Sequence, residues 1–299
     1  MENEKSIKEK KRVPTALTIH DLSCFGRCAL TVIIPTLSAM GVQTVPIPTA
    51  LLSTHTGGFE GFHFRDMTED MERIAAHLKD IDVECDAVYT GFLGSEEQIN
   101  TVSRIIDSFR LKQNGEKAPV LVDPVMGDDG RLYSTYTHGM MLGMRRLCEK
   151  ADVITPNLTE ACFLTDTRYI DTKEMTETEA LGFAKELCGK MAGFGARYIV
   201  ITGLHFGSNY VGTYGCDLQK GVDSGFICAS EHIDRSYPGT GDLFASVLLG
   251  ELMRERDFCS AVGLASDFTR RTIEYTAGFD TPIRNGVAFE ALLCQLWHE

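Results

Sequence analysis

The sequence predicts an α/β protein: a mostly parallel central sheet flanked by helices, with an antiparallel hairpin at one edge. Two observations indicate this fold class. Short β-branched runs alternate with longer helical patterns, and several of the runs are continuously apolar, as strands covered on both faces are. No internal repeat, low-complexity segment or Pro/Gly-rich linker divides the chain, which favours one domain.

Eight strands are expected from these runs. They are Ala16–His20, Val42–Pro48, Ala87–Thr90, Val120–Val122, Val153–Thr155, Tyr198–Thr202, Tyr210–Tyr214 and Phe226–Ala229. Strand–helix alternation gives right-handed crossovers and therefore parallel pairing. The last two strands are joined through residues 215–221 without a helical pattern, which predicts the antiparallel edge hairpin.

Apolar residues at helical spacing predict helices between the strands. The clearest stripes run over Leu30–Leu37, Ile99–Phe109 and Leu243–Leu252. We assign these stripes to core packing. In sheets of this kind ligands bind beyond the carboxyl ends of the strands, so the residues that follow each strand are the candidates for chemistry.

Composition bounds the function. The chain has 299 residues and a net charge of −13, which argues against a nucleic-acid partner but not against a phosphate-bearing substrate. No apolar stretch is long enough to cross a membrane, and the charged residues 1–12 lack the apolar core of a secretory signal. We expect a cytoplasmic protein with a solvated, disordered tail over 1–12 and a folded domain over 13–299.

Ten cysteines are scattered singly through the chain, and Cys24 and Cys28 are the close pair. Without a second Cys or His pair nearby, a metal or redox site there is weakly supported. Reduced cysteines that fill core space explain the pattern better.

The strongest chemical signal is Pro238-Gly239-Thr240-Gly241-Asp242, directly before a predicted helix. Two glycines and a helix N-terminus can present free N–H groups to a developing anion. Asp242 at the helix start can accept a proton from a hydroxyl. An ordinary acidic residue in the first turn of a helix is the alternative.

Two further loops carry carboxylates. Asp123 ends a strand and Asp128 follows a glycine, and two carboxylates on one loop suit Mg²⁺ or form a plain polar turn. In Thr155-Pro156-Asn157-Leu158-Thr159-Glu160, Glu160 either reaches a metal-bound water or completes a capping box with Asn157. The spacing alone favours the capping box.

The segment Ser53–Gly58 contributes hydroxyls, an imidazole and a glycine pair, which suit a polar pocket, a lid hinge or a hydrogen-bonded turn. The sequence contains neither a P-loop nor a dinucleotide-binding glycine motif.

In this order along the chain, the motifs resemble the ribokinase-like superfamily. The glycine–Asp242 motif is shared across that superfamily, and the two carboxylate loops narrow the resemblance to its vitamin kinases. His20-Asp21-Leu22-Ser23 with Ser53–Gly57 resembles the pyridoxal (vitamin B6) kinases. The resemblance implies ATP-dependent phosphorylation of the 5′-hydroxymethyl group of a B6 vitamer in pyridoxal phosphate salvage, with Mg²⁺, a monovalent cation such as K⁺, and a homodimer.

The resemblance also implies residue roles. Asp242 is the catalytic base, and Gly239, Thr240 and Gly241 stabilise the transferred phosphoryl group. ATP is bound by Asp123, Asp128, Thr155, Asn157, Thr202 and Thr240, and Mg²⁺ by Asp128 and Glu160. The vitamer is bound by Ser23, His55, Thr56 and Phe92. The segment after Asp128, residues 130–136, is rich in Gly and Tyr, and we expect it to form a flap that closes over the phosphates and excludes water.

Some positions depart from that pattern. Cys24–Cys28 replaces the Gly-Tyr-Val-Gly of pyridoxal kinases, Phe92 replaces a Tyr, and Gly203 replaces a hydroxyl residue. Hydroxymethylpyrimidine kinase is the alternative, although its typical Gly-Gly-Ala-Gly near the first strand is missing here. A non-catalytic ligand-binding protein on the same fold is a further alternative, which the presence of both Asp242 and Asp128 disfavours.

Overall fold

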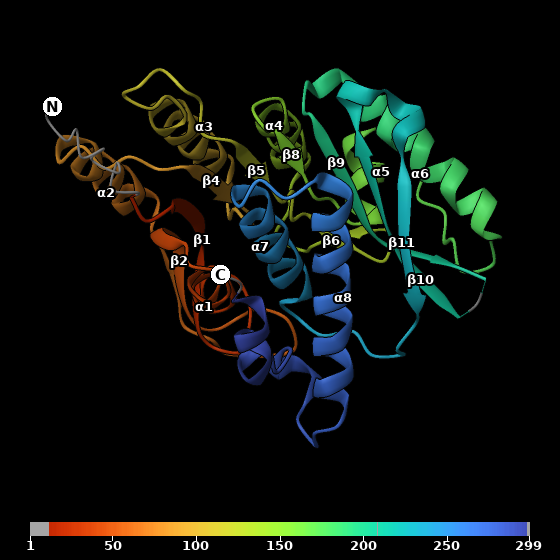
Figure 1. The fold of residues 1–299 in the computed structure, drawn as a ribbon. Helices are drawn as coiled ribbons and strands as arrows, with labels where there is room; N and C mark the ends of the chain where they lie inside the picture. Colours follow the sequence, from red (N-terminus) through yellow and green to blue (C-terminus); the bar gives the residue numbers. More distant parts are fainter. Residues whose placement is uncertain (1–11, 208, 298–299) are drawn as a thin grey trace, which may run out of the picture.

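A nine-stranded sheet runs through the middle of the molecule in the order β11-β10-β9-β8-β5-β4-β1-β2-β3 (Figure 1). The computed structural model describes residues 12–207 and 209–297. The strands of this sheet span Thr15–Phe25 (β1), Gln43–Thr54 (β2), Phe64–Asp66 (β3), Ala87–Thr90 (β4), Val120–Val122 (β5), Val153–Ile154 (β8), Tyr198–Phe206 (β9), Tyr210–Asp217 (β10) and Phe226–Glu231 (β11). The predicted tail over 1–12 lies, except for Arg12, outside the described residues.

The pairing confirms the predicted sheet and adds one strand. Every pair from β2 through β1, β4, β5 and β8 to β9 is parallel. The predicted hairpin of β10 and β11 is antiparallel and pairs Tyr210 with Glu231 at one end. The opposite edge also carries an antiparallel strand, β3, which was not predicted. Its three residues are all exposed and show no alternation.

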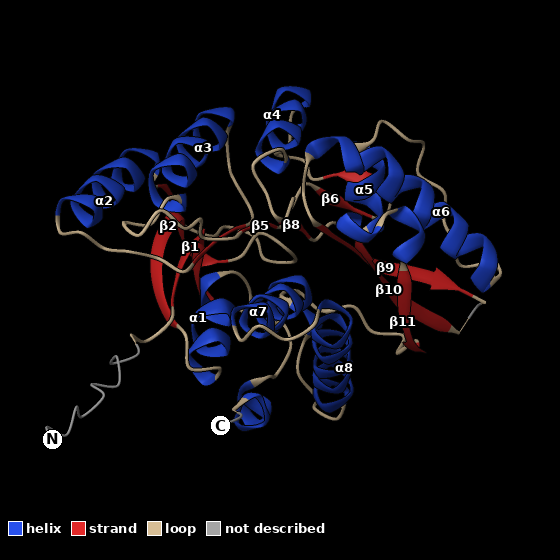
Figure 2. Cartoon of the chain, turned by 45° about the horizontal axis from the view of Figure 1, so that its top comes forward, coloured by secondary structure: helices blue, strands red, loops and turns tan. Residues whose placement is uncertain are grey.

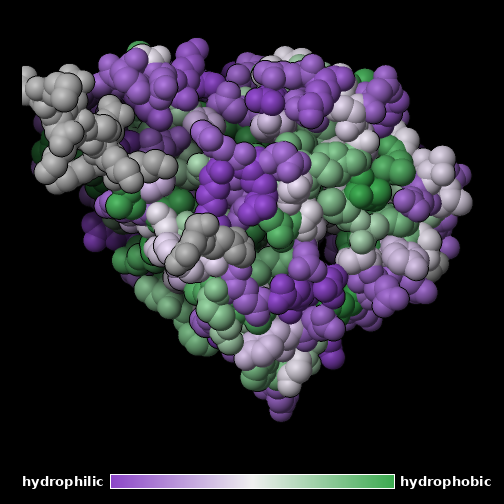
Figure 3. Space-filling model, in the orientation of Figure 1, coloured by the Kyte–Doolittle hydropathy of each residue, from purple (hydrophilic) through white to green (hydrophobic). Residues whose placement is uncertain are grey.

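Helices cover the sheet on both faces (Figure 2). They span Leu30–Ala39 (α1), Thr68–Asp80 (α2), Glu96–Arg110 (α3), His138–Cys148 (α4), Leu158–Leu164 (α5), Glu177–Met191 (α6), Thr240–Met253 (α7) and Phe258–Ala277 (α8). One apolar cluster lies between the sheet and α2 to α6, and a second lies between the sheet and α1, α7 and α8. Hydrophilic residues cover much of the face seen in Figure 3. None of the helices within the described residues is long and apolar enough to span a membrane.

Strand β2 continues six residues beyond the predicted end at Pro48 and carries two prolines. Pro46 and Pro48 pair with β1 on one side, whereas β3 joins the other side of β2 from Ala50 onward. A proline has no N–H to give to a ladder, so it is tolerated where the second side of a strand is open. The longer strand brings residue 54 to the same sheet edge as Phe25, the last residue of β1.

A small hairpin stands apart from the main sheet. β6 (Gly127–Asp128) pairs with β7 (Arg131–Leu132) in antiparallel fashion. Asp129 and Gly130 between them both have positive φ, at 47° and 72°, as the two-residue turns that suit hairpins require. The predicted flap over 130–136 is therefore partly a β-strand, and Tyr133 N–H donates to the carbonyl of Met126 (2.9 Å).

Candidate active site

The glycine turn at the start of α7, residues 238–242, has a backbone geometry that requires glycine. Gly239 has φ 81° and is the N-cap of α7, which begins at Thr240. A Cβ at Gly239 would lie 2.2 Å from the carbonyl oxygen of Arg27, so both the backbone angle and the space require glycine. The free N–H groups of the first turn of α7 therefore point out of the helix end where the sequence predicted an oxyanion nest.

Asp242 lies in the first turn of α7 and is half-buried. Its Oδ2 accepts a hydrogen bond from the N–H of Ala29 (2.8 Å), the N-cap of α1, where φ is +49°. Burial raises the pKa of Asp242 to about 6, against the lowering effect of that hydrogen bond and with help from the charge of Asp21. A carboxyl held in place and titrating near neutral pH is suited to take a proton from an alcohol.

Three carboxyl groups, those of Asp123, Glu160 and Asp242, lie near one another at the end of β5. Burial raises the pKa of Asp123 well above its ordinary range, and the charges of Glu160 and Asp242 raise it further. None of the ion pairs formed within the described part of the chain includes any of the three. An acidic group without a compensating cation is costly, so the cluster fits a ligand that brings positive charge.

The acids fit Mg²⁺ that is carried largely by phosphate. Within residues 12–207 and 209–297 no group of three His, Cys, Asp or Glu side chains is arranged to hold a metal by itself. Mg²⁺ in phosphoryl-transfer sites keeps several waters and uses one or two carboxylates together with phosphate oxygens. The carboxylate of Asp123 lies close to the nest, since a Cβ on Gly241 would lie 3.9 Å from its Oδ2.

Glu160 forms the capping box that the spacing favoured. The side chain of Asn157 accepts from Glu160 N–H (2.9 Å), and Glu160 Oε2 accepts from Asn157 N–H (2.8 Å). Its Oε1 accepts from Met126 N–H (3.0 Å). Burial raises the pKa of Glu160 to about 8 despite these bonds. Both oxygens of Glu160 already accept an N–H group of the protein, and its predicted role toward Mg²⁺, through water, stays a prediction.

Asp128 is exposed on the β6–β7 hairpin, and its Oδ1 accepts from the N–H of Asp129 (2.9 Å). The hairpin is anchored to α5, because Gly130 N–H donates to Thr159 Oγ1 (2.9 Å). A Cβ on Gly127 would lie 2.1 Å from the carbonyl of Arg131, so glycine is needed for the close pairing. The structure thus joins the two carboxylate loops through hydrogen bonds between backbone groups of one loop and side chains of the other.

Of the residues predicted to line the nucleotide, Thr155 and Asn157 follow β8, Thr202 lies within β9 and Thr240 begins α7. Thr155 is buried, and Thr202 forms an isolated parallel bridge with Asn157. Asn157 Nδ2 donates to the carbonyl of Gly127 (2.9 Å), so its amide is used within the protein. Thr240 Oγ1 donates to the carbonyl of Tyr237 (3.1 Å). These contacts order the strand ends and leave the contacts with a nucleotide as predictions.

The predicted substrate residues lie in the last part of β1 or beyond the ends of β2 and β4, and these three strands are neighbours in the sheet. Ser23 is fully buried, and its Oγ donates to Asp21 Oδ2 (3.0 Å). Asp21 was not predicted as a site residue. Thr56 is exposed beyond the end of β2, and Phe92 is half-buried beyond the end of β4. Their place at one sheet edge agrees with a shared pocket.

His55 has a different set of contacts from those expected of a substrate ligand. Its Nδ1 accepts from Gly57 N–H (3.1 Å), so Nε2 carries the proton and donates to the carbonyl of Arg284 (2.6 Å). The ring also meets Phe59 edge to face, with centroids 5.0 Å apart. Both ring nitrogens are used inside the protein, which makes His55 a positioning residue for the loop that carries Thr56.

The C-terminal turn packs against the β1–α1 loop, a contact that sequence reasoning missed. Arg27 N–H donates to the carbonyl of Asn285 (3.0 Å), and the guanidinium of Arg27 pairs with Glu290 (2.6 Å). A Cβ on Gly286 would lie 2.5 Å from the Arg27 carbonyl, the same oxygen that faces Gly239. The turn therefore packs directly behind the β1–α1 loop. The contacting residues are more than 250 positions apart, so no local sequence pattern predicts these contacts.

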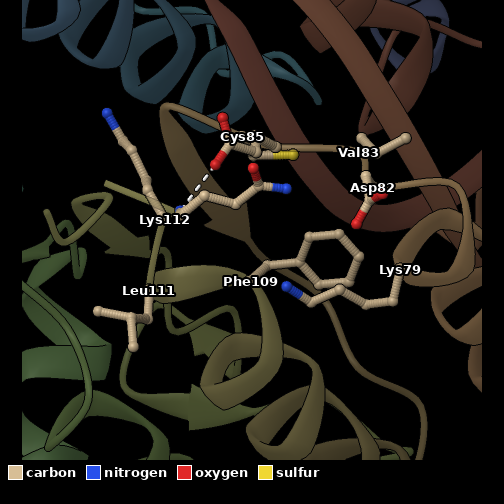
Figure 4. A pocket seen from close by; sticks show the side chains of 9 residues that line it. Lys79, Asp82, Val83, Cys85, Phe109, Leu111 and Lys112 are labelled. Carbon is tan, nitrogen blue, oxygen red and sulfur yellow. Dashed lines mark hydrogen bonds between the residues drawn. The ribbon is translucent and has the colours of Figure 1, made fainter. Parts of the chain in front are cut away.

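A small hollow of about 40 Å³ lies elsewhere, at the amino end of β4 (Figure 4). It is lined by Lys79, Phe109, Lys112 and their neighbours, and Gln113 N–H donates to the carboxylate of Glu84 (2.7 Å). Its position at the opposite end of the strands separates it from the site.

Known proteins resemble this chain over nearly its whole length. A family model described as phosphomethylpyrimidine kinase matches residues 32–285. A hydroxymethylpyrimidine/phosphomethylpyrimidine kinase of Streptomyces coelicolor is 27% identical over 92% of each chain. A pyridoxine/pyridoxal/pyridoxamine kinase of Bordetella avium is also 27% identical, over 87% of this chain and 84% of its own.

Solved structures agree. A Bacteroides thetaiotaomicron protein provisionally named a phosphomethylpyrimidine kinase is 38% identical, with a TM-score of 0.87 over 97% of this chain and 96% of its own. A second crystal form of it, with pyridoxal, gives 0.85 over 95% and 96%. Pyridoxal kinase of Lactobacillus plantarum is 28% identical, with 0.83 over 95% and 97%. The chain belongs to the phosphomethylpyrimidine kinase family of the ribokinase-like superfamily, and it is a kinase that phosphorylates a hydroxyl group.

Proposed function

We propose that the protein transfers the γ-phosphoryl group of ATP to the 5′-hydroxymethyl group of a B6 vitamer. The observation that carries this proposal is the Bacteroides crystal form with pyridoxal, which is 38% identical and covers 95% of this chain. The pyridoxal kinase of Leishmania donovani in complex with ADP and pyridoxamine, 25% identical with a TM-score of 0.81, supports adenine nucleotide as the second substrate.

The residues support in-line transfer by positioning and electrostatics. Asp242, held by the Ala29 N–H, accepts the proton of the substrate hydroxyl through its free oxygen. The N–H groups of Gly239 to Gly241 stabilise charge on the transferred phosphoryl group. Mg²⁺ would neutralise phosphate charge beside Asp123 and, through water, Glu160. Asp128 is exposed on the β6–β7 hairpin, and we propose that it contributes to binding Mg²⁺ and the phosphates of ATP.

The nucleotide would lie along Thr155, Asn157, Thr202 and Thr240, which stand beyond the end of β8, within β9 and at the start of α7. The vitamer would lie against Ser23, Thr56 and Phe92, with the aromatic face of Phe92 against the ring. Ser23 is fully buried near the end of β1, so its hydroxyl is better placed to bind an atom of the substrate ring than to contact solvent.

Hydroxymethylpyrimidine kinase is the second candidate, favoured by the family model and by the Streptomyces relative. Both substrates are flat nitrogen heterocycles with a primary alcohol, so the same catalytic residues could phosphorylate either of them. The difference must lie in the substrate end. The absence of Gly-Gly-Ala-Gly after the first strand is the feature that favours the vitamer.

Further expectations belong to the same proposal. We propose a cytoplasmic homodimer with a single kinase domain over 13–299, a requirement for Mg²⁺ and activation by a monovalent cation such as K⁺. Nucleic acid and membrane are not proposed as partners, because the net charge is −13 and the substrate is small.

The test is a substrate panel with purified protein, ATP and Mg²⁺. Pyridoxal, pyridoxamine, pyridoxine, hydroxymethylpyrimidine and fructose are compared by kcat/KM. The proposal expects the highest value with a B6 vitamer and none with fructose. A higher value with hydroxymethylpyrimidine than with every vitamer would transfer the proposal to the second candidate.

A further inference from the structure

Asp21 and Ser23 form a hydrogen-bonded pair at the end of β1. Residues two apart on a strand point to the same side, and both side chains are buried. Ser23 Oγ donates to Asp21 Oδ2 at 3.0 Å. A hydroxyl has one proton, so once Ser23 has given it to Asp21, its oxygen can only accept hydrogen bonds from other groups.

Asp21 is a buried acid that forms no ion pair with the residues that the structure describes. No ion pair among the described residues includes it, although eighteen are formed elsewhere. Burial raises the pKa of Asp21 against the lowering effects of the Ser23 hydrogen bond and of the nearby His55, and the charge of Asp21 in turn helps to raise the pKa of Asp242. A buried carboxylate without a positive partner is unfavourable, and a ligand that brings a donor or a positive charge relieves the cost.

The backbone at this point is irregular in a way that re-aims side chains. Between His20 and Leu22, two steps on β1 are matched by three on β2, from Pro48 to Leu51, so β2 bulges beside Asp21. Bulges recur next to active sites, where they redirect side chains. β1 then leads into the loop that supplies the Ala29 N–H to Asp242, so the pair and the catalytic acid share one segment.

We propose that Asp21 and Ser23 form an acceptor-only edge of the substrate pocket, which binds an N–H donor of a heterocyclic substrate. This inference rests on the proposed function. In a B6 vitamer the donor is the protonated ring nitrogen of the 3-hydroxypyridine, so the vitamer binds as the pyridinium form. A neutral ring nitrogen would place its lone pair against two oxygen acceptors, which is repulsive. Asp21 is thereby a specificity-determining residue.

The test compares pyridoxine with its carbocyclic analogue, in which C–H replaces the ring nitrogen. The wild-type protein should prefer pyridoxine by about tenfold to a hundredfold in kcat/KM, as expected for one lost buried partner. Asp21→Asn keeps the shape and an acceptor for Ser23 but offers an amide N–H₂ without charge. It should lose most of that preference through KM for pyridoxine, with KM for ATP unchanged.

The matched control is Asp223→Asn, an exposed acid that pairs with Lys185 far along the chain. It should keep the wild-type preference. A folded Asp21→Asn protein that also keeps the full preference would overturn the inference. If Asp21→Asn does not fold, Ser23→Ala removes one of the two acceptors and should lose part of the preference; an unchanged preference there would overturn it equally.

Failure of the proposed function has a separate signature. If the wild-type protein phosphorylates no B6 vitamer, binding is measured for 4-amino-5-hydroxymethyl-2-methylpyrimidine and for its analogue with methyl in place of the amine. A preference for the amine that disappears in Asp21→Asn upholds the acceptor-only edge without the vitamer. The same preference in both proteins contradicts it.

Discussion

The phosphate end and the substrate end of this site are built in different ways. At the phosphate end, Gly239–Asp242 and Asn157–Glu160 are short stretches whose own hydrogen bonds and helix starts fix them. At the substrate end, the loop after β2 is held to the C-terminal turn through His55 and Arg284, 229 residues apart in the chain. Local motifs therefore locate the chemistry, whereas specificity depends on long-range packing.

The two ends meet at Arg27. Its carbonyl oxygen faces Gly239 on one side and Gly286 on the other, and neither glycine could carry a Cβ without a clash. A change at the C-terminal turn should reach the catalytic turn through this residue. We therefore expect variants at the phosphate end to change kcat, and variants at the substrate end to change mainly KM.

The largest effect is expected at the phosphate end, for Asp242→Asn. The amide keeps an oxygen for the Ala29 N–H but cannot take a proton, so kcat should fall by about 10² to 10⁴-fold while ATP binding persists. Steady-state kinetics and nucleotide binding by calorimetry measure the two quantities. A variant with nearly normal kcat would remove Asp242 from the mechanism.

The same carboxyl predicts a pH dependence. Asp242 accepts a proton only when ionised, and its pKa is raised to about 6. The kcat of the wild-type protein should therefore rise as the pH rises through about 6, and fall about tenfold per unit below it. A profile that is flat from pH 5 to 7 would contradict this assignment.

Glu160→Gln should come next, with an effect on stability. The glutamine oxygen can accept only one of the two N–H groups of Met126 and Asn157, so unfolding should be easier by about 1–3 kcal/mol at pH 6. Because the pKa of Glu160 is raised to about 8, the folded protein holds that proton more tightly than the unfolded chain. The contribution of Glu160 to stability is therefore lost as the pH rises toward 8, and the gap between the two proteins should narrow.

Denaturant unfolding at pH 6 and pH 8 measures that gap, and a gap that widens would oppose the argument. Activity as a function of Mg²⁺ concentration separates the two roles of Glu160. A raised Mg²⁺ requirement supports the water-mediated role, whereas an unchanged curve with lower stability leaves Glu160 as a helix cap.

At the substrate end, His55→Gln should raise KM for the vitamer by about fivefold to thirtyfold, with little change in kcat. Two hydrogen bonds of about 1 kcal/mol each tie the loop to Gly57 and Arg284. His63→Gln, an exposed neighbour on the same segment, is the control and should behave as the wild type. A drop in kcat without a change in KM would mean that the two ends are not separate.

Arg284→Ala should have the smallest effect. Its guanidinium lies over the ring of Phe59, 5.0 Å from the centroid, and donates weakly to the Gly58 carbonyl (3.3 Å). An exposed cation–π contact contributes about 0.5–1 kcal/mol, so KM for the vitamer should rise about twofold to fivefold. Arg73→Ala, whose side chain is exposed and pairs with Glu69, is the matched control. Equal KM values for both variants would show that the side chain of Arg284 does not support the loop.

The sequence predicted the parts of the fold that have a regular pattern. Buried strands such as β4 and β5 stand within a residue of their expected bounds because both faces are apolar. β3 was not predicted because its three residues are all exposed and show no alternation. β2 was predicted too short because prolines usually end strands. The capping box of Asn157 and Glu160 was readable because its spacing is fixed by one helical turn.

The tertiary links of the site could not be predicted. The bond from Ala29 to Asp242 spans 213 residues, and its strained φ appears only in the folded chain. His55 looked like a ligand because an imidazole beside glycines is typical of pockets, yet its partners lie within the protein. Asp21 lies inside a motif named from the sequence, but its burial and its hydrogen bond from Ser23 appear only in the folded chain.

The central claim is that this kinase acts on a B6 vitamer, and direct competition tests it most simply. Pyridoxine and hydroxymethylpyrimidine are mixed in equal amounts with the protein, ATP and Mg²⁺, and the phosphorylated products are measured by mass spectrometry at low conversion. The ratio of products equals the ratio of kcat/KM values. We predict that pyridoxine phosphate is the main product, and an excess of hydroxymethylpyrimidine phosphate would contradict the claim.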